Sequence, residues 1–198
     1  MEQLYVYSWT AEERSRTQIR AYGIDSAGDT VALIISDFTP YVYIELPNTP
    51  DWKLVLQDLD RDLSSKVLLT KVVERQHLYS SRGVGKFLFC QCSSRKQIGY
   101  ISFMLRQNTY RGHRLQLHED LATSVLQLTS LRQVPMATWL CYRGTLVPES
   151  EQQTRCDREV SVSWRNLFPS TETRQVKPKV LAFDLEVNSD QMNAMPSN

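Results

Sequence analysis

Residues 41–51 are Tyr-Val-Tyr-Ile-Glu-Leu-Pro-Asn-Thr-Pro-Asp, and they predict a β-strand that leads into a helix. Aromatic and β-branched residues dominate 41–46 and favour the strand. Thr49, Pro50 and Asp51 then supply a hydroxyl cap, a proline for the first turn and an acid near the positive end of a helix. The helix that follows would bury a stripe of apolar side chains at helical spacing: Trp52, Val55, Leu56, Leu59 and Leu63.

The chain after this helix predicts two more strands, a second helix and a short closing strand. In order, these are a strand at about 66–79, a turn at 83–85, a strand at 86–92, a helix capped by Ser93 or Ser94 with Ile98, Ile101 and Leu105 on one side, and a strand at 113–118. The resulting order is β-α-β-β-α-β. It is the order of the ferredoxin-like arrangement, which small RNA-recognition modules share.

Strand-forming sequence flanks this unit on both sides. The preceding residues predict a meander of strands at 3–9, 17–24 and 30–36. The following residues predict a third helix, begun by the charges of Glu119 and Asp120 and marked by Leu121, Val125, Leu128 and Leu131. Two more strands are expected at 136–143 and 158–164.

These elements predict an α+β fold in three parts. We expect a β-rich part from 1–40 and 132–170, and a ferredoxin-like part from 41–131 that includes the third helix. A turn-rich linker at 169–178 then precedes the start of a further domain at 176–198.

Composition indicates a soluble, intracellular protein. The chain has 198 residues, 41% hydrophobic and 23% charged, which suffices for one ordinary core and part of a second unit. It has no run of about 18 apolar residues and no signal-peptide pattern. The four cysteines are scattered and are interpreted as reduced and structural. His77, His113 and His118 lack a metal-site spacing to a carboxylate, so we interpret each as structural or as part of a basic face.

One segment is strongly basic although the formal net charge is only +1. No acid lies between Glu74 and Glu119, where eight bases alternate with Tyr and Phe residues. Such a mixture is typical of single-stranded nucleic-acid binding, for which the candidate residues are Arg82, Lys86, Arg95, Lys96, Arg106, Arg111 and Arg114. The alternative is a solvated basic surface over core aromatics. Phe87 and Phe89 share a strand face, and we expect them to pack in a core.

Two acids near the end of the chain are candidates for metal binding. Asp184 and Glu186 follow an apolar run and point to the same face of a predicted strand, roughly 6.5 Å apart along the backbone. Paired carboxylates suit Mg²⁺ or Mn²⁺, and two-metal sites stabilise both oxygens of a phosphodiester displacement. The alternative is a chance pair of surface acids, since a motif this short is common.

The residues around these acids carry a family resemblance. Phe183-Asp184-Leu185-Glu186, with Pro178-Lys179, Asn188-Ser189 and Met195-Pro196, resembles the first motif of the 3′-5′ proofreading exonuclease in family B DNA polymerases. Upstream, the run 37–47, the triplet 118–120 and the pair 139–140 resemble landmarks of that family's amino-terminal domain, in the same order and most closely those of large DNA viruses. Leu185 stands where Ile is usual, and the family's later carboxylate motifs have no counterpart up to Asn198.

The resemblance implies the amino-terminal part of a viral DNA-directed DNA polymerase, ending in the first strand of an RNase H-like exonuclease domain. It implies Asp184 and Glu186 as catalytic residues that bind Mg²⁺ or Mn²⁺ in the complete enzyme. It also implies template, primer and dNTP as ligands, a sliding clamp as a candidate partner, and action in the host nucleus or at a cytoplasmic viral replication site. Alone, this chain would be an inactive, monomeric scaffold that contacts single-stranded template. The alternative is a free-standing nucleic-acid-binding module.

Overall fold

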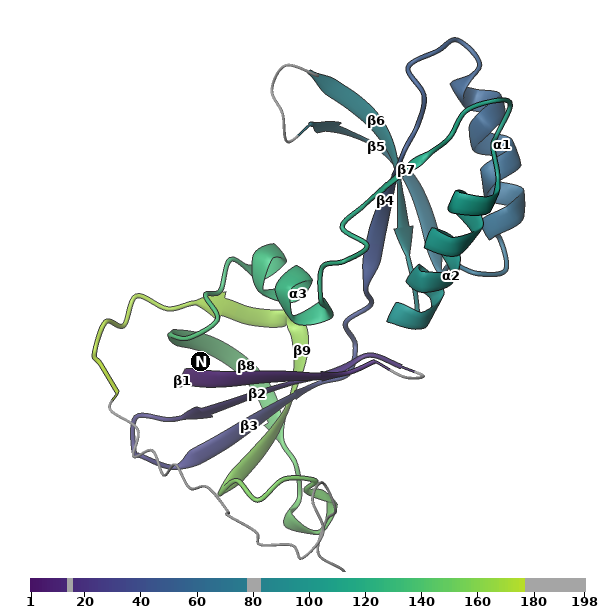
Figure 1. The fold of residues 1–198 in the computed structure, drawn as a ribbon. Coiled ribbons are helices and arrows are strands. Elements are labelled where there is room, and N and C mark those ends of the chain that lie inside the picture. Colours follow the sequence, from purple (N-terminus) through teal and green to yellow (C-terminus); the bar gives the residue numbers. More distant parts are fainter. Residues whose placement is uncertain (14–15, 78–82, 177–198) are drawn as a thin grey trace, which may run out of the picture.

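The computed structural model describes residues 1–13, 16–77 and 83–176. Figure 1 shows two β-structures joined by the extended chain between β3 and β4. The first is a closed barrel in the order β1-β2-β3-β9-β8, and the second is a four-stranded sheet in the order β5-β6-β4-β7. The fold is therefore α+β, as the sequence predicts.

The barrel combines the start and the end of the described chain. Its strands are β1 (Glu2–Glu12), β2 (Gln18–Ile24), β3 (Thr30–Ile35), β8 (Trp139–Leu146) and β9 (Arg158–Pro169). The predicted meander is confirmed by the antiparallel pairs β1-β2 and β2-β3. Closure was not predicted, and it depends on a parallel pair between β3 and β9 together with antiparallel β1-β8 and β8-β9 pairs.

The turn between β2 and β3 is held by one side chain. Asp25 Oδ1 accepts hydrogen bonds from the backbone N–H groups of Ala27, Gly28 and Asp29 at 2.8, 3.0 and 3.0 Å. Gly28 has a φ of 99°, which a residue with a Cβ adopts only with strain. The two strands therefore pair directly across this turn.

Helix α3 (Ser124–Arg132) packs on the barrel. Its buried Val125 and Leu128 belong to the same hydrophobic cluster as Leu4, Leu33 and the other inward side chains of the barrel. The predicted start at Glu119 and Asp120 is wrong, because Thr123 is the cap and its Oγ1 accepts from Leu126 N–H at 3.2 Å.

The apolar stripe predicted for α3 is only partly correct. Leu121 precedes the helix and is 85% exposed, and Leu131 is 47% exposed, so neither joins the core. Gln127 and Thr129 are buried in their place.

The four-stranded sheet confirms the predicted β-α-β-β-α-β order. Its elements are β4 (Tyr41–Glu45), α1 (Trp52–Leu63), β5 (Leu69–Gln76), β6 (Val84–Gln91), α2 (Arg95–Gln107) and β7 (Gln116–His118). All neighbouring strands are antiparallel. Figure 1 shows α1 and α2 on one side of the sheet, where Leu59, Leu88 and Ile101 are among the residues of a second buried cluster.

The caps of these two helices differ from those expected. Asp51, not Thr49, occupies the N-cap of α1, and Thr49 Oγ1 donates to the Asp51 carboxylate. At α2 the N-cap is Ser94, but its side chain makes no capping bond. Gln97 Oε1 instead accepts from the N–H and the hydroxyl of Ser93 at 2.8 and 3.0 Å.

The cysteines carry no disulfide. Cys90, Cys92 and Cys141 are buried, Cys156 is partly exposed, and all four are free thiols. Burial raises the pKa of the Cys92 thiol to about 11 and also raises the pKa of Cys90, which keeps both thiols protonated. This agrees with the interpretation of the cysteines as reduced.

Candidate nucleic-acid interface

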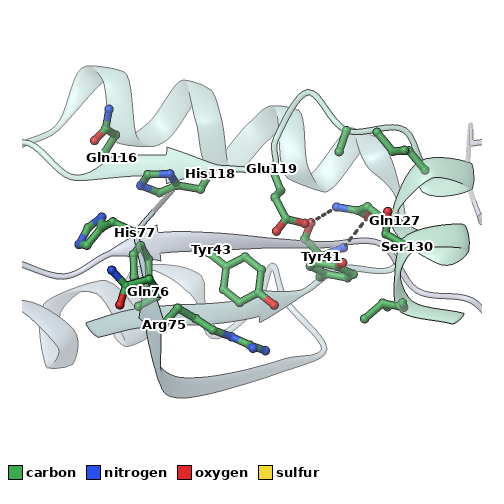
Figure 2. A pocket seen from close by; sticks show the side chains of 14 residues that line it. Tyr41, Tyr43, Arg75, Gln76, His77, Gln116, His118, Glu119, Gln127 and Ser130 are labelled. Atoms are coloured by element: carbon green, nitrogen blue, oxygen red, sulfur yellow. Dashed lines mark hydrogen bonds between the residues drawn. The ribbon is translucent and has the colours of Figure 1, made fainter. Parts of the chain in front are cut away.

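A groove of about 890 Å³ lies on the sheet face that α1 and α2 leave open. Tyr43 of β4, Arg75 of β5 and Phe87 of β6 form its floor, and α3 contributes the wall with Leu126 and Leu131. Figure 2 shows Tyr43 and Arg75 close together, with His77 and His118 to one side of them and Gln127 to the other. We call this space the sheet-face groove.

The floor of the sheet-face groove is aromatic because two neighbouring strands each place rings on this face. Residues two apart on a strand share a face, so Tyr41 and Tyr43 lie beside Phe87 and Phe89 of the paired strand. The Tyr43 ring centre is 6.5 Å from that of Phe87 at an interplanar angle of 85°, and 5.4 Å from that of Phe89. The first pair is edge-to-face and the second is tilted at 57°, and both separations lie in the range of favourable aromatic contacts.

The expected core packing of Phe87 and Phe89 is confirmed only in part, because Phe87 is buried but joins neither core cluster and Phe89 is only partly buried. Phe87 is 5% exposed and Phe89 packs against the barrel cluster. Both rings point away from α1 and α2, whose cluster takes Leu88 and Cys90 of the same strand. Tyr43 is half-buried beside Phe87 on the same sheet face, so the floor presents a partly accessible ring next to a buried one.

Arg75 provides a cation above this floor. Its guanidinium carbon lies 6.0 Å from the centre of the Tyr43 ring, within the range of a cation–π contact. No carboxylate of the described residues lies within 4.0 Å of its nitrogens. Burial raises the pKa of the Tyr43 hydroxyl, and the charge of Arg75 opposes that shift.

Two histidines flank one carboxylate beside the floor. His118 Nε2 is 2.9 Å from Glu45 Oε2, and His77 Nε2 is 3.9 Å from Glu45 Oε1. The Phe87 ring centre is 5.2 Å from the ring centre of His77 and 5.4 Å from that of His118. The histidines are thus part of the groove, and among the described residues no group of three or more His, Cys, Asp or Glu could hold a metal ion.

Gln127 of α3 fixes the wall of the groove to the floor. Its Oε1 accepts from the backbone N–H of Tyr41 at 3.3 Å, and its Nε2 donates to the Tyr41 carbonyl at 2.7 Å (Figure 2). This pairing replaces a missing strand partner, because β7 pairs β4 only from Tyr43 to Glu45. Gln127 is 2% exposed, so both hydrogen bonds are shielded from water.

Glu119 makes the α3 end of the groove acidic. The residue lines the groove, and it stands just past the end of β7 with a φ of 64°. Burial raises the pKa of the Tyr41 hydroxyl, and the negative charge of Glu119 raises it further. The charges of Arg75 and Glu119 both act on the hydroxyls of Tyr41 and Tyr43, so the groove holds one cation and one carboxylate close to the same two rings.

The basic residues predicted to bind nucleic acid are spread over the ferredoxin-like unit, as far as the structure describes them. Lys86 lies on the other sheet face, with its ammonium 5.6 Å from the Trp52 ring centre. Arg95 Nη2 donates to the Asp120 carbonyl at 2.6 Å, and Arg111 Nε donates to Asp58 Oδ2 at 2.9 Å.

The three remaining described cations are exposed, and they are Lys96, Arg106 and Arg114. Lys96 and Arg106 are about 15 Å apart along α2, given the helical rise per residue. None of the three lines the sheet-face groove. Arg82, Asp184 and Glu186 lie outside the described residues.

Sequence reasoning missed Tyr41, Tyr43 and Arg75 as site residues. The signal was present in the alternation of Tyr41 and Tyr43 on one inner strand with Phe87 and Phe89 on the other. In a β-α-β-β-α-β sheet these two strands are central, so their outward-facing rings lie side by side. Arg75 belongs to the basic segment, but it is not among the residues predicted from the sequence to bind nucleic acid.

Comparison with known proteins agrees with this architecture. No family model matches the chain. The chain is 33% identical over 201 residues to a putative DNA polymerase of Frog virus 3, covering 98% of this chain and 18% of that protein. It is 27% identical over 235 residues to the DNA polymerase of Invertebrate iridescent virus 6, covering 96% of this chain and 18% of that protein.

The chain is homologous to part of the family B DNA polymerases of large DNA viruses. The family B DNA polymerase of the archaeon Pyrobaculum calidifontis shares the fold, with a TM-score of 0.67 at 16% identity over 86% of this chain and 21% of that one. The resemblance inferred from the sequence motifs is confirmed. The chain spans about a fifth of the length of the polymerases it matches. No helix among the described residues is long and apolar enough to cross a membrane.

Proposed function

We propose that this chain is the amino-terminal region of a DNA-directed DNA polymerase that acts in viral DNA replication and proofreads with a 3′-5′ exonuclease. The main support is that the similarity to viral DNA polymerases extends over nearly the whole chain. The alignment with the Frog virus 3 protein covers 98% of this chain. Similarity confined to one short motif would be weaker support. In this proposal residues 1–40 and 132–170, the ferredoxin-like unit 41–131 and the exonuclease start at 176–198 form successive parts of one polypeptide.

The role proposed for the chain is to support the exonuclease and to guide single-stranded template. Its aromatic groove and basic segment offer the two kinds of contact that a single strand requires, namely flat rings for bases and cations for phosphates. Template, primer and dNTP are the ligands proposed for the whole enzyme.

Asp184 and Glu186 are the proposed contribution of this chain to exonuclease chemistry. Two carboxylates supply the oxygen ligands that Mg²⁺ and Mn²⁺ prefer, so the donor set fits the metal. The bound metal would stabilise charge on the oxygens of the phosphodiester. Further carboxylates are needed to complete the site, and we expect them later in the polypeptide.

The proposal predicts the coding sequence beyond Asn198. Reading the gene past this codon is expected to reveal additional acidic motifs and a polymerase region in the same frame. Sequencing the transcript provides the measurement. A stop codon directly after Asn198 would contradict the polymerase assignment for this product and would favour the free-standing nucleic-acid-binding module.

Single-strand binding by the chain is expected to weaken steeply as salt is raised. Each phosphate contact contributes roughly −0.7 to the slope of log K against log salt for single strands, so three contacts give a slope of about −2. Fluorescence anisotropy of a labelled oligothymidylate at several NaCl concentrations measures this slope. A slope near zero would show that the cations do not contact phosphates.

A further inference from the structure

We propose that the sheet-face groove holds one unstacked nucleotide of a single strand, with the base on Tyr43 and the adjoining phosphate at Arg75. The inference rests on the proposed function and gives the nucleic-acid contact a defined place. Among the residues that the structure describes, the groove is not lined by the basic residues that the sequence analysis predicted to bind nucleic acid. Lys86, for example, lies on the opposite face of the sheet.

The first argument is the shape and chemistry of the floor. Tyr43 is half-buried, and Phe87 contacts it edge-on and is itself 5% exposed, so the Tyr43 ring cannot sink into the sheet. A supported ring of this kind can stack a base, whatever its identity, because every base has a flat face. Duplex DNA hides those faces by stacking them on each other, so the occupant is a single strand.

The second argument is the charge of Arg75. Arg75 stands 6.0 Å from the Tyr43 ring centre and has no carboxylate partner among the described residues, so its charge is available to a phosphate. Glu119 also lines the groove, and its charge acts on the hydroxyls of Tyr41 and Tyr43, so it disfavours a second phosphate beside these rings. The guanidinium of Arg75 is therefore the place in the groove for one phosphate, beside the Tyr43 ring.

The third argument concerns the rim and the wall. Gln76 and Gln116 line the groove with exposed amides that can donate to and accept from base edges. Across from them, Leu126 and Leu131 are 50% and 47% exposed, which gives apolar cover for a base or sugar. A site with a stacking floor, an apolar wall and few polar groups is typical of nucleotide binding in single-stranded recognition.

Two substitutions with matched controls test the inference. Tyr43→Leu removes the aromatic face while keeping bulk, and Arg75→Gln removes the charge. Their controls are Tyr100→Leu, on an exposed face of α2, and Arg143→Gln, exposed on β8. Binding of a labelled twelve-residue oligothymidylate is measured by anisotropy, and thermal melting shows that each variant is folded.

Tyr43→Leu is expected to weaken binding about tenfold or more, since stacking of one base on an aromatic side chain has that effect. Arg75→Gln is expected to lower the magnitude of the salt slope by about 0.7. Both controls should bind as the parent chain does. A strand that carries 5-iododeoxyuridine should crosslink on irradiation to Tyr43, as located by peptide mass spectrometry.

The outcomes separate this inference from the proposed function. If the parent chain binds the strand but Tyr43→Leu and Arg75→Gln bind equally well, or the crosslink maps elsewhere, the groove is not the site and the proposed function is untouched. If thymidine monophosphate competes as well as the oligonucleotide at equal nucleotide concentration, the occupant is a free nucleotide and the strand assignment is overturned. If the parent chain binds no single strand at low salt, the template contact in the proposed function fails as well.

Discussion

Replacing Asp184 and Glu186 together by alanine is expected to abolish 3′-5′ digestion in the full polymerase while leaving nucleotide incorporation intact. Both side chains are proposed ligands of the metal, whose stabilisation of charge is worth several kcal/mol. Since about 1.4 kcal/mol corresponds to a factor of ten in rate, digestion should fall at least about a hundredfold. Incorporation is expected to persist because the polymerase site would lie in a later part of the polypeptide.

Digestion of a mismatched 3′ end with Mg²⁺ and extension of a matched primer are the two measurements. Asp190→Ala provides a control in the same stretch, because it removes an acid that lies outside the Asp184-Leu-Glu186 spacing. The 198-residue chain alone should digest nothing, since it would hold only part of the ligand set. Full digestion by the double variant would show that the two acids are surface residues.

Replacing Gln127 by leucine is expected to give the largest loss of stability among the groove residues. The substitution leaves the buried N–H and C=O of Tyr41 without partners, and each unsatisfied group costs about 1–3 kcal/mol. The free energy of unfolding should therefore fall by about 2–6 kcal/mol, which is a large share of the roughly 5–15 kcal/mol of an ordinary domain.

Urea unfolding followed by circular dichroism measures this loss. Gln57→Leu makes the same chemical change at an exposed position of α1 and should shift stability by no more than about 0.5 kcal/mol. Equal effects of the two substitutions would mean that the Gln127 amide does not hold α3 to β4.

Local patterns were sufficient to predict most elements of this fold. The strand and helix at 41–63 follow from β-propensity and from helical spacing of apolar residues, and the β-α-β-β-α-β order follows from repeating the same reasoning along the chain. The burial of Phe87 was also predicted. These features depend on interactions between residues that are close in the sequence, and such interactions can be inferred from the sequence alone.

The features that were not predicted depend on distant partners. Barrel closure requires β3 to pair with β9, which follows it by more than a hundred residues. Gln127 meets Tyr41, and His118 meets Glu45, only after α3 and β7 have docked. Leu121 and Leu131 continue an apolar period but find no surface to pack against, so periodicity alone assigned them wrongly. The groove depends on both kinds of interaction. The alternation of its aromatic residues along β4 and β6 can be read from the sequence, whereas its wall comes from α3, which is distant in the sequence.

The pairing of β3 with β9 also has a consequence for how the protein emerges from the ribosome. The first three barrel strands are complete by Ile35, but the free edge of β1 has no partner until β8 has been synthesised, and the free edge of β3 has none until β9 has been synthesised. The β-α-β-β-α-β unit, which is complete by His118, can fold in that interval because its pairings are internal. Unpaired strand edges can pair with other chains. A chaperone would therefore be most useful while β1, β2 and β3 have been synthesised but β8 and β9 have not.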